Sequence, residues 1–77
     1  MENTKYYWVL PYAKRLKVFF ASDISQAMEK DEFYFTVSII VVAIEYWIQE
    51  GCIDILPHYY SSSGHQVKKY VYVKDPE

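Results

Sequence analysis

The side chains of this sequence that could do chemistry are one thiol, two imidazoles and a run of serines, all in its later part. His58 and His65 have no Cys, Asp or Glu at a spacing typical of a metal site, and Cys52 with His58 is an unspecific pair. Ser61 and His65 could act as nucleophile and base, but no third group is placed to orient the imidazole. The two glycines are too few for a phosphate-binding loop. We predict no enzyme activity, metal, other cofactor or small-molecule substrate.

Basic side chains form a second group of candidates, and they lie toward the two ends of the sequence. The net charge is −2, yet no Lys or Arg occurs between Lys30 and Lys68, where carboxylates accumulate. Two basic clusters could contact the phosphates of double-stranded DNA, although ordinary solvated surfaces carry such clusters too. Their members are Lys14, Arg15 and Lys17 in the first cluster and His65, Gln66, Lys68 and Lys69 in the second.

The apolar middle of the chain predicts a long helix over residues 36–50, capped by Thr36 and ended by Gly51. At 100° per residue, one stripe of this helix must pack on the rest of the domain. The stripe comprises Val37, Ile40, Ile44, Trp47 and Ile48. The opposite face holds Ser38, Ile39, Val42, Tyr46 and Gln49, with Glu45 at its edge.

Shorter elements must position this helix. The segment KYYWVLPYAKRLKVFF predicts a helix or short strand up to about Leu10, then a helical piece around residues 12–17 and an extended VFF. ASDISQAMEKDE predicts a helix of two to three turns with Ser22 or Asp23 as its N-cap. After Gly51, CIDILPHYY and VKKYVYVKD predict a hairpin, and Pro57 suits an edge strand.

This order of elements resembles the winged helix-turn-helix superfamily over residues 18–74. SDISQAM is similar to the first helix of that motif, residues 36–50 to its recognition helix and residues 52–74 to its wing, with AIEYWIQEGCI the most specific piece. The resemblance implies a small α+β winged-helix domain with a three-helix core and a C-terminal β-hairpin wing. It also implies DNA binding, with the recognition helix in the major groove and the wing on phosphates. The segment KDEFYF departs from the tight turn of the family.

The outward face of the long helix decides between two functions. Ser38 and Gln49 could contact base edges, but the helix carries no Lys or Arg, and Glu45 would repel phosphates. Apolar residues on that face favour burial against another protein. The candidates for protein binding are Ile39, Val42 and Tyr46. We predict a regulatory binding module that forms a homodimer or binds a partner protein, with a DNA-binding transcriptional regulator as the alternative.

Length and composition set the remaining expectations. The 77 residues, 52% of them hydrophobic, predict one folded domain over residues 1–77. The single Cys52 cannot form an internal disulfide, which fits a reducing compartment. The first residues have no apolar signal segment, and VSIIVVAI is too short to span a bilayer. We expect a cytoplasmic protein without a membrane segment.

Overall fold

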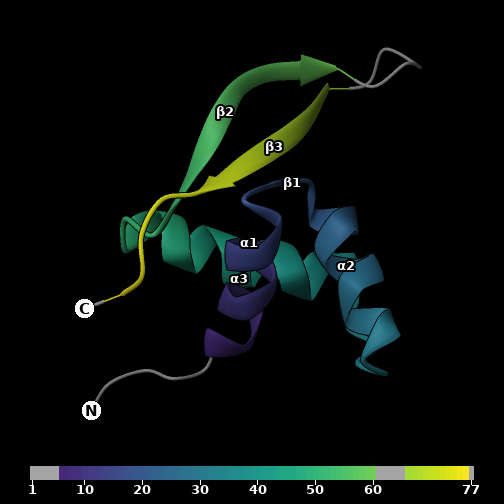
Figure 1. The fold of residues 1–77 in the computed structure, drawn as a ribbon. Coiled ribbons are helices and arrows are strands. Elements are labelled where there is room, and N and C mark those ends of the chain that lie inside the picture. Colours follow the sequence, from purple (N-terminus) through teal and green to yellow (C-terminus); the bar gives the residue numbers. More distant parts are fainter. Residues whose placement is uncertain (1–5, 61–65, 77) are drawn as a thin grey trace.

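The described residues form a small α+β domain of three α-helices with a C-terminal hairpin, as the sequence predicted, and a short third strand joins the hairpin in an antiparallel sheet (Figure 1). The computed structural model describes residues 6–60 and 66–76. The long helix α3 lies against α2 and the 3-10 helix before α1, and the β2–β3 hairpin rises from one end of this helical layer as a wing. The elements are the 3-10 helix η1 (Tyr7–Val9), α1 (Leu10–Leu16), β1 (Val18–Phe19), α2 (Ala21–Lys30), α3 (Val37–Gln49), β2 (Ile53–Tyr60) and β3 (Gln66–Tyr72).

The segment that the sequence left open between helix and strand is helical. η1 runs directly into α1, and Pro11 occupies the first turn of α1, where a missing amide hydrogen costs nothing. α1 ends at Leu16, and the residue that follows, Lys17, has a positive φ of 69°. This turn redirects the chain so that Val18 and Phe19 can pair with β3 as β1.

The predicted N-cap of α2 was wrong, whereas both ends of α3 are confirmed. α2 begins at Ala21 with Phe20 as its N-cap, because the chain is still extended there; the Asp23 carboxylate accepts a hydrogen bond from the Phe20 amide at 2.8 Å. Thr36 caps α3 by accepting a hydrogen bond from the Ile39 amide at 3.3 Å. Gly51 has φ 86°, a conformation that side chains disfavour, and so lets the chain leave α3 for β2.

The sheet has the order β1-β3-β2, so the hairpin is joined by the short β1 on the far side of β3. Phe19 lies opposite Tyr70 across one antiparallel pair, and Ile55 lies opposite Tyr70 across the other. β2 is an edge strand, which confirms the placement of Pro57 on an edge. The register of β2 with β3 shifts between Leu56 and Tyr59.

The core lies between the inner face of α3, the other helices and the base of the sheet. Trp47 is 2% exposed, and its indole N–H donates a hydrogen bond to the Tyr6 carbonyl at 2.9 Å. Cys52 is buried, as expected for a small hydrophobic residue. The fully or almost fully buried core residues of α3 are Ile40, Ala43, Ile44 and Trp47.

Two residues of the predicted inner stripe of α3 are not fully in the core: Ile48 is only partly buried, and Val37 is exposed. Val37 is 46% exposed, while Ala43, which was not assigned to the stripe, is fully buried. The buried side of α3 is therefore centred closer to Ala43 than the sequence predicted. The reason is η1, whose Tyr7 ring packs edge-on against Trp47 with centroids 5.0 Å apart and so covers that side of the helix.

Within the described part of the chain, no helix has the length and apolar character needed to cross a bilayer.

Candidate protein-interaction surface

The outer face of α3 presents aliphatic side chains to solvent. Ile39 is 49% and Val42 is 50% exposed, close to the value for Val37, so about half of each side chain has no cover within the chain. Ser38, Glu45 and Gln49 are exposed on the same helix. The structure thus places the predicted residues Ile39, Val42, Ser38 and Gln49 at the surface.

Tyr46 differs from the other two predicted protein-binding residues because it is partly buried. Its ring packs against Tyr6 at 5.4 Å and edge-on against Trp47 at 4.9 Å. Burial raises the pKa of the Tyr46 hydroxyl, with a smaller contribution from the Glu50 carboxylate. Tyr46 therefore links the outer face to the core and offers a partner only part of its surface.

The segment that leads into α3 extends the apolar surface and was missed as a binding element. Phe33 is 51%, Tyr34 73% and Phe35 37% exposed, directly before the Thr36 cap. The signal was present in the sequence, since three consecutive aromatic residues are unusual in an exposed connection. We name Phe33, Tyr34, Ile39 and Val42 together the outer apolar surface. Val37 is exposed on a different side of α3, in the groove described next.

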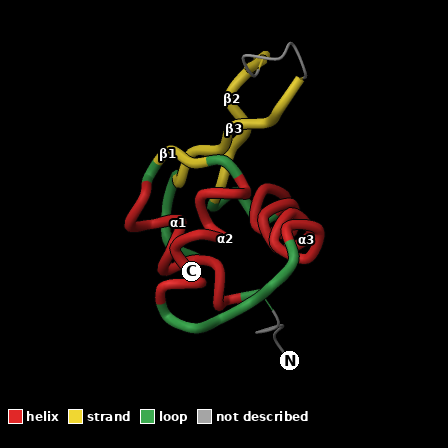
Figure 2. Tube along the Cα trace, turned by 90° about the vertical axis from the view of Figure 1, so that its right-hand side faces the viewer, coloured by secondary structure: helices red, strands yellow, loops and turns green. Residues whose placement is uncertain are grey.

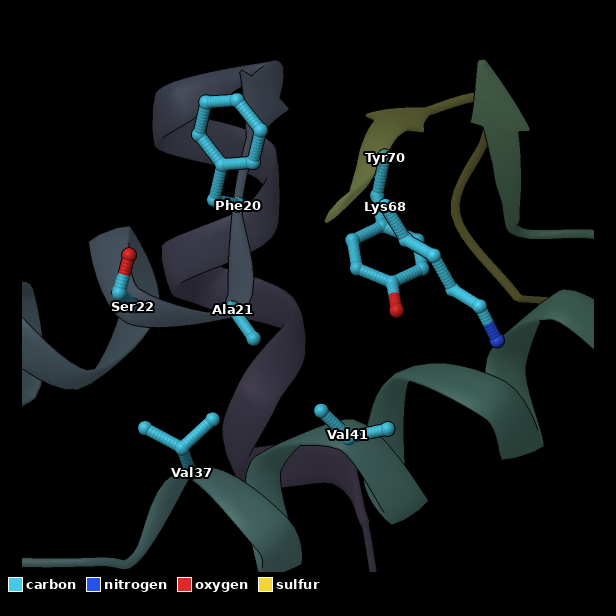
Figure 3. Close-up of a pocket in the computed structure, with 7 residues that line it drawn as sticks. All are labelled: Phe20, Ala21, Ser22, Val37, Val41, Lys68 and Tyr70. Atoms are coloured by element: carbon cyan, nitrogen blue, oxygen red, sulfur yellow. The ribbon is translucent and has the colours of Figure 1, made fainter. Parts of the chain in front are cut away.

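An apolar groove adjoins this surface between the start of α2, α3 and β3 (Figure 3). Its volume is about 410 Å³. In Figure 3, Val37 and Val41 rise from α3 on one side, while Tyr70 and Lys68 reach down from β3 on the other. The groove explains why Val37 is not buried, because the wing stands apart from the first turn of α3. The remaining lining residues are Phe20, Ala21 and Ser22.

The basic residues of the wing have partners within the chain. The Lys68 ammonium lies 3.9 Å from the Glu45 carboxylate of α3, and the Lys69 ammonium lies over the Phe20 ring at 5.2 Å. Burial raises the pKa of the neighbouring Tyr70 hydroxyl, and the Glu45 carboxylate adds to this rise. Of the other candidates in this cluster, His65 lies outside the described residues, and only the backbone of Gln66 is described, in β3.

The basic residues at and just after α1 also have partners within the chain. Lys14 forms an ion pair with Asp75 at 3.2 Å, Arg15 lies over the Tyr12 ring at 5.4 Å, and Lys17 lies over an aromatic ring of β3 at 6.0 Å. Figures 1 and 2 show α1 and α3 on opposite sides of the helical layer. Among the described residues, Lys14 and Lys17 contact β3 or the segment after it, whereas Lys68 contacts α3.

A hydrogen-bonded group ties the segment after β3 to α1. The Tyr72 hydroxyl donates to the Asp75 carboxylate, which also accepts from Lys14. Burial, followed by the hydrogen bond to Asp75, raises the pKa of Tyr72 to about 12. The same hydrogen bonds lower the pKa of Asp75. The basic side chain of Lys14 therefore serves an internal contact.

The residues first considered for catalysis or metal binding are not assembled in the described part of the chain. Cys52 is 1% exposed, and only the backbone of His58 is described, in β2. Ser61, like His65, lies outside the described residues. Among the described residues, no three His, Cys, Asp or Glu side chains are grouped to hold a metal ion.

Comparison with known proteins does not assign the chain to a family. No protein-family model matches the chain, and no curated protein matches it.

Proposed function

We propose that this winged-helix-like domain is a non-enzymatic, regulatory binding module that associates with protein through the outer apolar surface. The observation that supports it is the half-exposure of Ile39 and Val42 on a helix that carries no cation. Removing apolar surface from water contributes about 25 cal/mol per Å². Burying the exposed parts of several large side chains therefore yields several kcal/mol, against which the entropy of association must be set.

We propose a second copy of the chain as the occupant. In a two-fold dimer the same patch meets itself, so a charged patch would repel its copy. On α3 the only charge near Val42 is Glu45, which already lies beside Lys68, while Ser38 and Gln49 are neutral. Two copies of an uncharged apolar patch can therefore pack against each other without charge repulsion. We place this association in the cytoplasm, since a single buried cysteine, Cys52, that forms no internal disulfide suits a reducing compartment.

The test is the solution mass of the chain and of Val42→Lys, measured by sedimentation. The parent should associate as concentration rises, and Val42→Lys should be monomeric because its unpaired charge would lie in a dry interface. The fold should persist, since a surface substitution changes the free energy of unfolding by about 0.5 kcal/mol or less. Gln26→Lys, which adds the same charge at an exposed position of α2, should associate like the parent.

Two outcomes would contradict the proposal. If Val42→Lys associates as strongly as the parent, the outer apolar surface is not the interface. If the parent stays monomeric at high concentration, the second copy is the wrong occupant, and a different protein must cover the surface.

A transcriptional regulator that binds double-stranded DNA is the second candidate. The observation in its favour is that β3 carries Lys68 and Lys69 beside α3, with Lys68 within 3.9 Å of Glu45. In this model Ser38 and Gln49 would contact base edges while the wing contacts phosphates. An added lysine at Val42 would then raise nonspecific duplex affinity and leave the oligomeric state unchanged.

A further inference from the structure

A second cavity lies between α1, α2 and the segment that connects α2 to α3. Its volume is about 320 Å³, at the lower end of the range of small-molecule sites. Four of the lining side chains are aromatic, one is the almost fully buried thioether of Met28, and one is the cation of Arg15. The lining residues are Trp8, Pro11, Tyr12, Arg15, Met28, Phe33 and Phe35.

The aromatic walls are held by contacts within the chain but still present exposed ring surface. Trp8 and Phe35 meet edge-on with centroids 4.6 Å apart. The Tyr12 hydroxyl donates a hydrogen bond to the Asp31 carboxylate at 2.7 Å, which fixes the Tyr12 ring against the cavity. Phe33 remains about half exposed. A flat aromatic ligand could therefore stack or pack edge-on against several rings at once.

The charge of the cavity selects the kind of ligand. The Arg15 guanidinium lies over the Tyr12 ring, and within the described ranges no carboxylate forms an ion pair with it. Asp31 is not a lining residue, and its carboxylate already accepts the Tyr12 hydroxyl. A planar guanidinium binds a carboxylate through two parallel hydrogen bonds. Aromatic rings alone would also attract an organic cation, but Arg15 would repel one.

We propose that this cavity binds a small aryl carboxylate, a ligand of one or two aromatic rings that carries a single carboxylate. The ring lies among Trp8, Tyr12, Phe33 and Phe35, and the carboxylate accepts hydrogen bonds from Arg15. The site goes beyond the association proposed for α3, because its ligand is a small molecule and α1 supplies its cation. Binding involves no covalent step.

Three probes of matched size test the proposal: benzoate, benzyl alcohol and protonated benzylamine. The readout is the methyl resonance of Met28 in chain labelled with ¹³C-methyl methionine, since a bound ring shifts a methyl group that lines the cavity. Benzoate should give a saturable shift with a dissociation constant about tenfold below that of benzyl alcohol, as expected for a charge-assisted hydrogen bond. Benzylammonium should bind most weakly.

Two variants of equal charge change assign the preference to one side chain. Arg15→Gln should abolish the roughly tenfold advantage of benzoate over benzyl alcohol. Lys14→Gln should retain it, because Lys14 is adjacent in sequence yet lies outside this lining and pairs with Asp75. Both residues are exposed, so both variants should fold.

Three results would overturn the proposal. Benzoate that causes no saturable shift would show that the cavity is not a site. Benzylammonium that binds as tightly as benzoate would show that the rings select cations. An equal loss of the benzoate advantage in Lys14→Gln and Arg15→Gln would show that net charge, and not contact with Arg15, is responsible.

Discussion

Both faces of α3 carry aliphatic side chains, yet these side chains lie in opposite environments. Ile40 and Ile44 on the inner face are fully buried, whereas Ile39 and Val42 on the outer face are about half exposed. Residue type does not separate these faces, because isoleucine occurs on both. What separates them is the presence of η1, α1, α2 and the sheet on one side only. An apolar face that the chain itself leaves uncovered is the feature that a binding partner can use.

A substitution on the inner face of α3 should have the largest effect on the free energy of unfolding. Trp47→Ala removes a buried indole, its hydrogen bond to Tyr6 and its ring contacts, at a cost of about 3–5 kcal/mol. A small domain has a total stability of about 5–15 kcal/mol, with the shortest chains near the lower limit. The variant should be largely unfolded by circular dichroism at 25 °C. Trp8→Ala, which truncates a partly buried tryptophan, should keep a cooperative melt. A Trp47→Ala melt close to that of the parent would show that the facing of α3 is wrong.

The fold could be predicted from sequence because several local signals agree. Thr36 before an apolar run, Gly51 after it, and β-branched and aromatic residues on both sides of a polar turn all specify elements without tertiary information. The ends of the chain were less certain. In the segment around Pro11, aromatic residues favour strand while apolar spacing favours helix, and only packing of Tyr7 on Trp47 decides for helix.

The candidate site could be predicted only in part, and α3 shows why. When nearly every residue of a helix is apolar, the spacing of apolar residues does not fix which side of the helix is buried. The elements that pack against the helix then decide which side faces the core. For this reason Val37, which was predicted to be buried, is exposed, and Ala43, which was not assigned to the buried stripe, is buried. Burial of Tyr46 and the aromatic cavity at Arg15 depend on contacts between distant segments, which spacing along the chain does not encode.

Lys68 and Lys69 on the wing test whether the outer face of α3 binds DNA or protein. If α3 and the wing bind DNA, replacing both Lys68 and Lys69 by Ala should weaken binding to all duplexes similarly and reduce the salt dependence by one to two charges. The control replaces Lys30, which is exposed in the last turn of α2 and belongs to neither basic cluster, and it should leave the salt slope nearly unchanged. Fluorescence anisotropy across a salt series measures both. A parent without duplex affinity at low salt, or a wing variant with the parental affinity, would exclude the DNA alternative.

The smallest expected effect tests which side of α3 faces the core. Val37→Ala removes two methyl groups from a side chain that is 46% exposed, so the transfer cost is only part of the roughly 1.5–3 kcal/mol of a fully buried valine. Alanine is also the better helix former, by up to about 0.7 kcal/mol, which offsets part of that loss. The free energy of unfolding should therefore change by less than about 1 kcal/mol. Val9→Ala makes the same change at a fully buried position and should cost about 2 kcal/mol, including the cavity it leaves. Urea denaturation of both variants measures the difference. Equal costs would mean that Val37 packs in the core as the sequence stripe predicted, and that the groove beside it closes in solution.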